Sequence, residues 1–297
     1  KNYAQTGKKT GSTHSIRGVY IMKTFNKIIK VTGILLLSVT FFISALAFDL
    51  ENKDDLEKET DLIMNKYIDL SVPGASIAIV KDGEVFFSKG YGFADIKNKI
   101  PVIPDKTVFE YVSVNKLFVW VSAMQLKESG KLDLNENIEK YLPEEVRQNL
   151  HYSSSITMLD LMNHTAGFED TLFDFAKKDL GSLPKLQETV QISQPDQVFN
   201  PREIISYSNY GSTLAAYVIH EISGERFFDY ERKNIFFPVG MENIAGHPLY
   251  KYNPTLINNK AKGYISQGDG IFLDKGWVYV PGYPSGAADG TITALAK

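Results

Sequence analysis

The sequence contains no cysteine among its 297 residues. This absence excludes disulfides, thiolate metal sites and cysteine nucleophiles. The chain has only five histidines, so we expect no zinc site and predict neither a metal nor another cofactor. Acidic residues are absent from residues 1–47, which contain seven Lys and Arg, whereas the rest of the chain has 25 basic and 35 acidic residues. Such an acidic body argues against a nucleic-acid partner, because nucleic acids require clustered Lys and Arg.

Residues 22–47 have the pattern of a secretory signal. A basic segment from Met22 to Lys30 is followed by seventeen uncharged residues that end in Ala-Leu-Ala at Ala47. A basic start, an apolar run and a small-x-small end are the three parts of such a signal. An uncleaved membrane anchor is the alternative, because the run is just short of a comfortable span, and a buried core helix fits the charges less well. We therefore expect export to the cell envelope or the extracellular space, with residues 1–21 as a non-structural upstream segment.

Local patterns in the rest of the chain predict an α+β fold. Two β-rich runs flank Asp82-Gly83, and Asp-Gly in this position is a strong hairpin signal. Helical patterns follow in the middle of the chain, and residues 263–290 are rich in Gly, Pro and Tyr, which predicts loops with short strands. A hairpin at one end and a helical middle are typical of α+β architecture. Residues 49–60 are a charged entry that leads into a helical pattern through Tyr67. The other main predicted helices cover residues 113–129 and 214–222, and they are stopped by Gly130 and Gly224.

The motif Ser-x-x-Lys occurs twice, at Ser113/Lys116 and at Ser182/Lys185. The second copy has a proline inside it and is interpreted as chance. The first copy begins a helix with apolar residues on nearly every face, which is typical of a buried helix. Because Lys116 shares its helix face with Val119, Trp120 and Ala123, its ammonium group is predicted to point into the interior.

A simpler interpretation makes Ser113 a helix cap and Lys116 a surface lysine. Two physical arguments oppose it: a cation in the first turn opposes the helix dipole, and an unpaired buried charge costs several kcal/mol. A conflict of this kind is typical of a functional site. Burial also lowers the pKa of a lysine, which can then accept a proton from a hydroxyl one turn away. We therefore predict that Ser113 is a nucleophile and that Lys116 activates it.

Tyr207-Ser208-Asn209 precedes an apolar helical pattern. In an extended turn, residues two apart point the same way, so Tyr207 and Asn209 can reach one site. The phenol can transfer a proton, and the amide can hold a polar substrate or the lysine. The alternative is that Tyr207 belongs to an aromatic cluster and that Asn209 caps a helix.

Taken in order, these motifs resemble those of the serine β-lactamase-like family, close to class C β-lactamases, DD-peptidases and related esterases. Class A enzymes and penicillin-binding proteins pair Ser-x-x-Lys with Ser-Asp-Asn. Here Tyr-Ser-Asn fills the second slot, in the class C style. The resemblance covers roughly residues 60–297 and rests on segments 107–116, 124–134, 141–143, 156–167, 237–241 and 281–286.

The resemblance implies a β-lactamase/transpeptidase-like fold over residues 48–297, with an antiparallel sheet flanked by helices and a mainly helical lobe. It implies that Ser113 is the acylated nucleophile, Lys116 its activating partner, Tyr207 the general base or proton relay and Asn209 the orienting residue. His164, in a His-Thr-Ala-Gly turn, is interpreted as structural. The expected partner is a small-molecule or peptidoglycan-derived substrate.

Two departures from the family pattern affect these expectations. Arg202 follows Pro201 where relatives usually have Gly, which we interpret as a harmless change in a turn. The family's third motif, Lys-Thr-Gly or His-x-Gly on a C-terminal strand, is not found before Lys297. That strand supplies one of the two oxyanion-hole donors, and losing such a donor costs about 10²–10³ in rate. We therefore expect an incomplete sheet with an unpaired hairpin edge, and poor activity of this chain compared with the full-length gene product.

The predicted function is hydrolysis, through an acyl-enzyme, of an amide or ester such as a β-lactam, a D-Ala peptide or a small ester. We expect the enzyme to be exported, with membrane anchoring as an option, and to be monomeric. One alternative is a non-hydrolytic penicillin-binding or cell-wall-sensing pseudoenzyme. A second alternative is a structural exported module, for which Lys116→Met would be neutral or stabilising without any loss of function.

Overall fold

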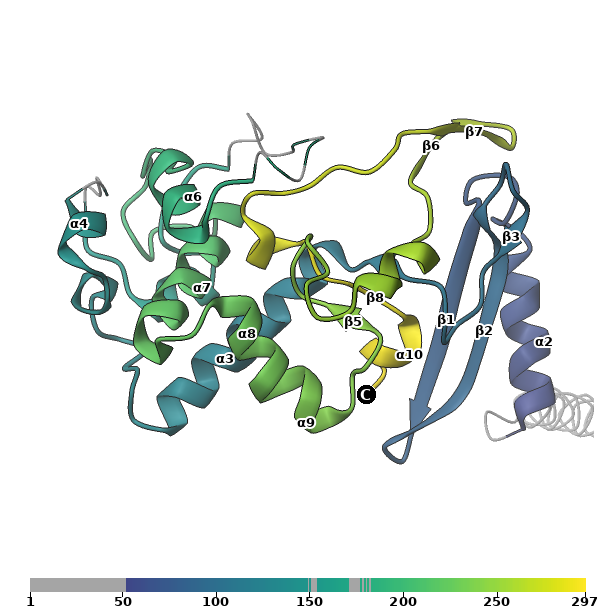
Figure 1. The fold of residues 1–297 in the computed structure, drawn as a ribbon, viewed down its shortest axis with the longest axis horizontal. Coiled ribbons are helices and arrows are strands. Elements are labelled where there is room, and N and C mark those ends of the chain that lie inside the picture. Colours follow the sequence, from purple (N-terminus) through teal and green to yellow (C-terminus); the bar gives the residue numbers. More distant parts are fainter. Residues whose placement is uncertain are drawn as a thin grey trace, which may run out of the picture. The chain divides into compact units, whose positions relative to one another are not determined.

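The computed structural model describes residues 52–148, 150, 154–170, 177, 179, 181 and 183–297, which Figure 1 draws as a ribbon. The chain divides into two compact units, Lys1–Ile63 and Met64–Lys297. The leader of residues 1–47 and the second Ser-x-x-Lys serine, Ser182, lie outside the described residues. None of the helices in the described ranges has the length and apolar character needed to span a membrane.

The predicted hairpin is present in the second unit. Strands β1 (Gly74–Lys81) and β2 (Glu84–Asp95) pair antiparallel and are joined by Asp82 and Gly83, whose φ angles are 53° and 80°. Positive φ at both central residues is what a tight hairpin turn requires. Strand β3 (Ile100–Pro101) pairs with β2, which gives the order β1-β2-β3. Among the described strands β1 is therefore an edge, and helix α10 (Ile292–Leu295) contacts it.

Short strands from distant parts of the chain build a second sheet. Strand β8 (Asp289–Gly290) lies between β4 (Phe109–Glu110) and β5 (Ile244–Ala245), and both pairings are antiparallel. A separate hairpin joins β6 (Tyr264–Gly268) to β7 (Ile271–Asp274). The expectation of loops with short strands in residues 263–290 is thus confirmed. The β4–β8 pairing brings the C-terminal segment beside the residues that lead into Ser113.

Helices occupy the middle of the chain, so the α+β prediction is confirmed. Helix α2 (Lys53–Met64) ends three residues before the predicted end at Tyr67, because the chain reverses there: the carbonyl of Tyr67 accepts from the N–H groups of Leu70 and Val72, and Asp69 has a φ of 65°. The other helical elements are η1 (Val112–Asn115), α3 (Lys116–Glu128), η2 (Ile138–Tyr141), α4 (Glu144–Arg147), α5 (Met158–Met162), α6 (Leu186–Ile192), α7 (Asn209–Ser223), α8 (Phe227–Glu231), η4 (Arg232–Phe236), α9 (Phe237–Val239), η5 (Pro254–Asn259) and η6 (Tyr283–Ser285).

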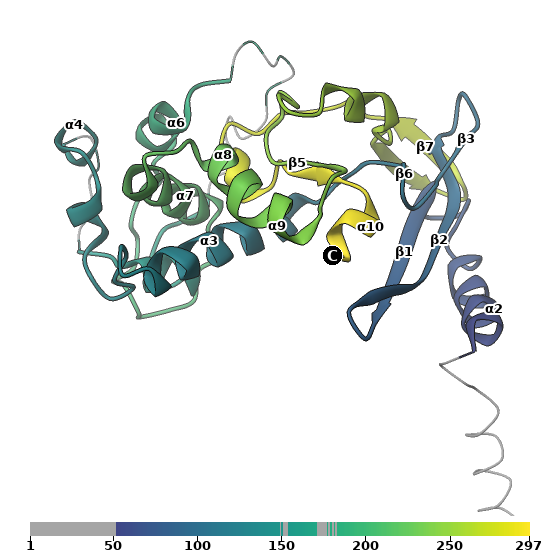
Figure 2. The ribbon, with the colours of Figure 1, turned by 60° about the horizontal axis from the view of Figure 1, so that its bottom comes forward.

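Helix α3 packs between two hydrophobic clusters. One face contributes Val119 and Ala123 to a large core shared with α7, and the two helices lie side by side in both ribbon views (Figures 1 and 2). Phe118 points to a second cluster, where its ring meets that of Phe236 edge-on at 5.0 Å between centroids. The expectation that α3 is buried on nearly every face is wrong for one stripe. Leu117 and Met124, seven residues apart, are 54% and 37% exposed, because neither cluster covers that side.

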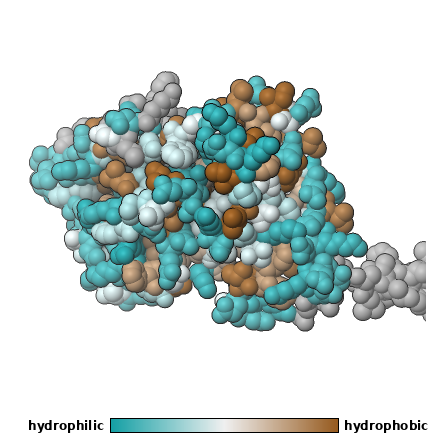
Figure 3. All heavy atoms as spheres, turned by 45° about the vertical axis from the view of Figure 1, so that its right-hand side comes forward, coloured by the Kyte–Doolittle hydropathy of each residue, from teal (hydrophilic) through white to brown (hydrophobic). Residues whose placement is uncertain are grey.

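The most exposed apolar hairpin is β6–β7. Ile265 and Leu273 face each other across the two strands, and both are more than half exposed, as is Ile271. Residues at i and i+2 of a strand share a face, so these three side chains form one apolar stripe. Apolar side chains gather in the upper part of the face drawn in Figure 3. This stripe lies on a different element from the predicted nucleophile.

Candidate active site

Ser113 lies in the turn that precedes α3, directly after a strained residue. Val112 has a φ of 49°, a left-handed conformation that costs a β-branched residue on the order of 1–3 kcal/mol. The backbone before it is held by the hydrogen bond from the Tyr111 N–H to the Ala288 carbonyl, 2.8 Å, next to the β4–β8 pair. The side chain of Ser113 is exposed at the start of the helix. Its N–H belongs to a first helical turn, whose donors have no partner within the helix.

Lys116 points into the protein, as predicted, and is only 4% exposed. Its Nζ donates to three oxygens: the carbonyl of Ser285 at 2.7 Å, Oδ1 of Asn209 at 2.8 Å and Oγ of Ser113 at 3.2 Å. An ammonium group has three N–H bonds, so these acceptors use its whole capacity. None of the three carries a charge, so the lysine is hydrogen-bonded without being neutralised.

Burial lowers the pKa of Lys116, because the charged form loses its hydration. Tyr207 and Asp170 oppose this effect without reversing it. A lysine with a lowered pKa has a larger neutral fraction near neutral pH, and a neutral amine can accept a proton. The hydroxyl that lies within its reach is that of Ser113.

Tyr207, from the segment that precedes α7, contacts the same serine. Its hydroxyl donates to Ser113 Oγ at 2.8 Å, and the Lys116 ammonium lies 4.9 Å from the centre of its ring. Ser113 Oγ therefore accepts from both the phenol and the lysine. The structure brings all three predicted groups together, although residues 113 and 207 are 94 positions apart in the sequence.

Asn209 reaches this cluster from the first turn of α7 and not from an extended turn as predicted. Helix α7 begins five residues before the predicted Leu214, because Ser208 caps it: its Oγ accepts from the N–H of Gly211 at 3.0 Å. Ser208 is extended while Asn209 is already helical. Tyr207 and Asn209 still converge on the same cluster, because Tyr207 donates to Ser113 and Asn209 accepts from Lys116.

Asp170 was not singled out in the sequence, yet it holds Asn209 in place. Its two carboxylate oxygens accept from the backbone N–H of Asn209 at 3.1 Å and from its Nδ2 at 3.0 Å. Asp170 lies three residues after the Gly of the His-Thr-Ala-Gly turn. That proximity is the only sequence signal for Asp170, because nothing else in the sequence distinguishes it from other aspartates in polar loops.

His164 contacts the loop that carries Tyr207. Its Nδ1 accepts from the Ser208 N–H at 3.2 Å, its carbonyl accepts from the Ser206 N–H at 2.7 Å, and its ring lies 4.5 Å from that of Tyr207. Burial and the nearby Lys116 both lower the pKa of His164, so the ring is neutral near neutral pH. These contacts fit the structural role expected for this histidine.

The segment Tyr283–Ser285 closes the other side of the site. Asn115 is fully buried, and its Nδ2 donates to the carbonyls of Tyr283 at 3.1 Å and Pro284 at 2.8 Å. The next carbonyl along the chain, that of Ser285, accepts from Lys116. Asn115 thus ties η6 to the start of α3. The sequence offered no reason to select the Asn inside the Ser-x-x-Lys motif or a backbone carbonyl 169 residues away.

Arg202 takes a backbone conformation that suits glycine better than arginine. Its φ is 72°, its N–H donates to the Thr165 carbonyl at 2.8 Å, and its Nε lies 3.1 Å from Oδ1 of the buried Asp160. Glycine adopts a positive φ without strain, whereas arginine does not. The ion pair with Asp160 is a contact that glycine cannot make.

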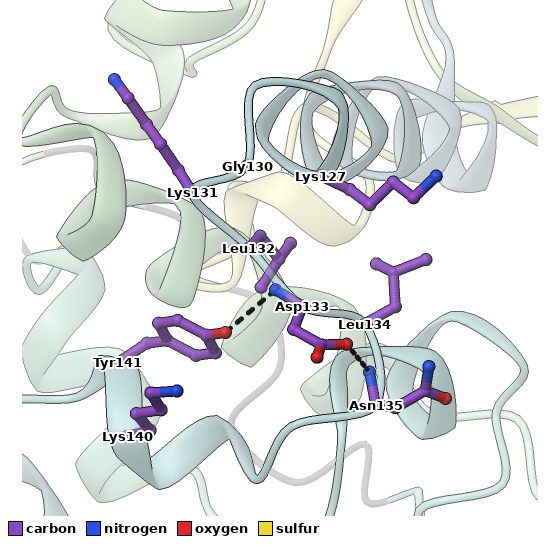
Figure 4. Close-up of a pocket in the computed structure, with 9 residues that line it drawn as sticks. All are labelled: Lys127, Gly130, Lys131, Leu132, Asp133, Leu134, Asn135, Lys140 and Tyr141. Carbon is purple, nitrogen blue, oxygen red and sulfur yellow. Dashed lines mark hydrogen bonds between the residues drawn. The ribbon is translucent and has the colours of Figure 1, made fainter.

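A hollow in the surface lies at the far end of α3 from Ser113. Figure 4 shows its lining, which includes Lys127, Lys131 and Tyr141, with the Tyr141 hydroxyl accepting from the Asp133 N–H at 2.9 Å. Helix α3 has thirteen residues, about 20 Å of length, so this hollow is separate from the serine cluster. Within the described ranges, no three or more His, Cys, Asp or Glu side chains are grouped as metal ligands.

Comparison with known proteins identifies the family of the chain. A family model for β-lactamases matches residues 56–251, which is more than half of the chain. The chain belongs to the serine β-lactamase and penicillin-binding protein family. The predicted family resemblance is thereby confirmed.

The relatives of this β-lactamase-family chain include longer proteins. Protein flp of Staphylococcus aureus (strain MRSA252) is 27% identical over 226 residues, which cover 75% of this chain and 44% of flp. Among solved structures, D-amino acid amidase from Ochrobactrum anthropi SV3 has a TM-score of 0.67 at 27% identity, covering 81% of this chain and 68% of that chain. The octameric penicillin-binding protein homologue from Pyrococcus abyssi has a TM-score of 0.67 at 25% identity, covering 82% and 55%. The chain thus spans less than half of flp, and its fold is β-lactamase/transpeptidase-like, as predicted.

Proposed function

We propose that this β-lactamase-family protein is an exported serine hydrolase that forms an acyl-enzyme on Ser113. The observation that carries the proposal is the double contact of Ser113 Oγ, with Lys116 Nζ at 3.2 Å and the Tyr207 hydroxyl at 2.8 Å. A hydroxyl next to a buried lysine and a phenol is arranged for loss of its proton as it attacks a carbonyl. Export is proposed from the leader pattern of residues 22–47.

The proposed reaction has two steps. Ser113 Oγ bonds to the carbonyl carbon while its proton passes to the neutral amine of Lys116, and the C–N or C–O bond of the substrate breaks as the leaving group takes up that proton by way of Tyr207. Water then attacks the ester carbonyl, and Tyr207 relays a proton from the water to Ser113 Oγ as the bond between Oγ and the acyl group breaks, which releases the acid and restores Ser113. The N–H of Ser113 is placed to donate to the oxyanion.

The substrate is proposed to be an amide or ester carbonyl. β-Lactams and D-amino acid amides are the first compounds to test, because relatives of the chain are described as a penicillin-binding protein homologue and a D-amino acid amidase. The expected monomer stays a prediction, and one of these neighbours is octameric.

Covalent labelling of the full-length protein tests this function. Fluorescent penicillin and a fluorophosphonate are expected to add one label, located on the peptide that contains Ser113, and Ser113→Ala is expected to abolish labelling. Ser129→Ala, at the exposed far end of α3, is the matched control and should label normally. Steady turnover of a β-lactam, a D-amino acid amide or a p-nitrophenyl ester supports a hydrolase. A stable label without any turnover would instead support the non-hydrolytic binder, and no label at all would refute the acyl-enzyme.

A further inference from the structure

The carboxylate of Asp170 and the ammonium of Lys116 hold the two ends of one amide. Asn209 Oδ1 accepts from Lys116 Nζ at 2.8 Å, and Asn209 Nδ2 donates to Asp170 Oδ2 at 3.0 Å. The second oxygen of Asp170 accepts from the backbone N–H of Asn209 at 3.1 Å. A hydrogen-bonded chain therefore runs from Lys116 through the Asn209 amide to Asp170.

This chain allows the amide of Asn209 a single orientation. A lysine ammonium has only donors, and an ionised carboxylate has only acceptors. The amide has one acceptor end and one donor end, so rotating it by half a turn would place NH₂ against the ammonium and oxygen against the carboxylate. Both contacts would then be repulsive, at the two charged ends where hydrogen bonds are strongest.

The backbone contact of Asp170 adds to this selection. Asn209 is the first residue of α7, where N–H groups lack partners within the helix and where a carboxylate is favoured by the helix dipole. Asp170 therefore accepts hydrogen bonds from both the main chain and the side chain of Asn209. The first bond fixes the position of the residue, and the second fixes the orientation of its amide.

We propose that Asp170 is a positioning residue of the active site, which acts through Asn209 to hold Lys116 against Ser113. The inference rests on the proposed function and deepens it, because it assigns a role to a residue that does not contact the serine in the hydrogen-bond network described above. Asp170 is exposed, and it provides a remote counter-charge that raises the pKa of Lys116 against the effect of burial.

The surroundings of Lys116 give the direction of the electrostatic effect. Tyr207 comes from the loop before α7, His164 from the turn after α5 and Asp170 from the segment that follows, while η6 contributes the carbonyl of Ser285. Of these, Tyr207 and Asp170 raise the pKa of Lys116 against the effect of burial. Removing the charge of Asp170 therefore lowers the pKa of the lysine further.

Asp170→Asn tests the proposal, with Glu169→Gln as the matched control. The control makes the same chemical change on the adjacent exposed residue. We expect Asp170→Asn to lower the second-order rate constant of Ser113 acylation about 10-fold, because the amide of Asn209 loses its preferred orientation. The acidic limb of the pH–rate profile should move to lower pH, because neutral Lys116 persists there. Glu169→Gln should change neither quantity.

Asp170→Glu separates charge from geometry. It keeps the negative charge but places the carboxylate one methylene further out, so we expect a slower acylation with the acidic limb close to its wild-type position. This second variant also keeps the test valid should Asp170→Asn reduce the yield of folded protein, which thermal unfolding of both variants measures.

A double-mutant cycle shows whether Asp170 acts through Asn209. In an Asn209→Ala background, Asp170→Asn should lower acylation by less than about 2-fold, because the group that it positions is already gone. A loss of about 10-fold in both backgrounds would overturn the proposal, as would an unmoved acidic limb in Asp170→Asn.

Failure of the proposed function can be told apart from failure of this inference. If the wild-type protein takes up no label on Ser113, the function is refuted, and the titration of Lys116 is then followed by NMR in protein with ¹³C-labelled lysine. A lower lysine pKa in Asp170→Asn and an unchanged one in Glu169→Gln would support the role of Asp170. Equal pKa values in the wild type and in Asp170→Asn would refute it.

Discussion

Two lysines of this protein have largely buried side chains and opposite surroundings. Lys116 is 4% exposed and donates only to uncharged oxygens, whereas the side chain of Lys260 is 5% exposed and lies 2.8 Å from Asp289 and 3.1 Å from Glu110. Burial lowers the pKa of Lys116. Burial acts on Lys260 in the same direction, but Asp289 and Glu110 outweigh it and its pKa is raised. Burial alone therefore does not determine the pKa of a buried lysine, because charged partners can reverse its effect.

The Lys260 cluster belongs to the framework of the active site. Glu110 is on β4 and Asp289 is on β8, the pair of strands beside the turn that carries Ser113. The Tyr250 hydroxyl also donates to Asp289. Burial raises the pKa of Asp289 as well, but we take the pair as charged, because two carboxylates face one ammonium at hydrogen-bonding distance. Two carboxylates neutralise the charge of Lys260, whereas burial favours the neutral form of Lys116, which can accept a proton.

The largest expected effect follows from Lys116→Met. Acylation of Ser113 should fall on the order of 10³-fold, because the serine loses the amine that accepts its proton. Stability at pH 7 should stay the same or rise, since an unneutralised buried cation is replaced by an apolar side chain. Because the folded pKa of Lys116 is below the unfolded value of 10.5, wild-type stability should increase with pH between these two pKa values, and the variant should lack this rise.

Labelling kinetics with fluorescent penicillin and urea unfolding measure the two effects of this change. Lys127→Met, on the exposed end of the same helix, is the control and should leave both unchanged. A variant that keeps its acylation rate would show that Lys116 is not the group that accepts the proton of Ser113.

Lys260→Met should have the opposite effects, with a loss of stability and little change in the acylation of Ser113. It leaves Asp289 buried without its cation, which is expected to cost about 3–5 kcal/mol of the free energy of unfolding. The folded fraction should still label on Ser113. The raised pKa of Lys260 means that its contribution is fully present below the unfolded value of 10.5 and is lost only as pH rises through the folded value. Urea unfolding of the wild type and the variant at pH 7, where Lys260 is charged in both the folded and the unfolded state, measures this loss.

Lys262→Met is the matched control for this framework lysine. The Lys262 side chain is 32% exposed and lies 3.3 Å from Asp274 and 3.5 Å from Asp95, so its ion pairs are screened by solvent and contribute little to stability. Equal losses in the two variants would contradict the distinction between a buried and a solvent-exposed pair.

Glu231 extends the comparison to a buried acidic side chain. It is fully buried, and neither carboxyl oxygen has a hydrogen-bond partner in the described part of the chain. Burial raises the pKa of Glu231 well above its usual value, so the native state holds it neutral. Its favourable effect is complete below the unfolded pKa of 4.5 and is lost as pH rises from there towards the folded value.

Glu231→Gln should therefore gain stability relative to the wild type by about 1 kcal/mol between pH 5 and pH 6. Urea unfolding at the two pH values measures this difference. Glu242→Gln, which changes an exposed carboxylate, should show no such trend. A constant difference between Glu231→Gln and the wild type would mean that Glu231 is ionised in the native state.

Local patterns carried much of the prediction because they depend on neighbours in the chain. Asp82-Gly83 determined the hairpin turn, since both residues take a positive φ. Ser113 and Lys116 met because one helical turn separates them. The end of α2 and the start of α7 were missed, because a chain reversal at Tyr67 and a serine cap at Ser208 override helix propensity there.

The sequence by itself determined that a serine and a lysine share one turn of a largely apolar helix, and that a hairpin lies N-terminal to it. Only the tertiary structure decided which oxygens receive the lysine's three N–H bonds, because Asn209 and the Ser285 carbonyl come from segments 93 and 169 residues away. It also decided that Asn209 donates a hydrogen bond to Asp170 and that Lys260 forms an ion pair with Asp289. The physical reason is that hydrogen bonds and ion pairs depend on distances in space, and periodicity along the chain reports only on those within a single element.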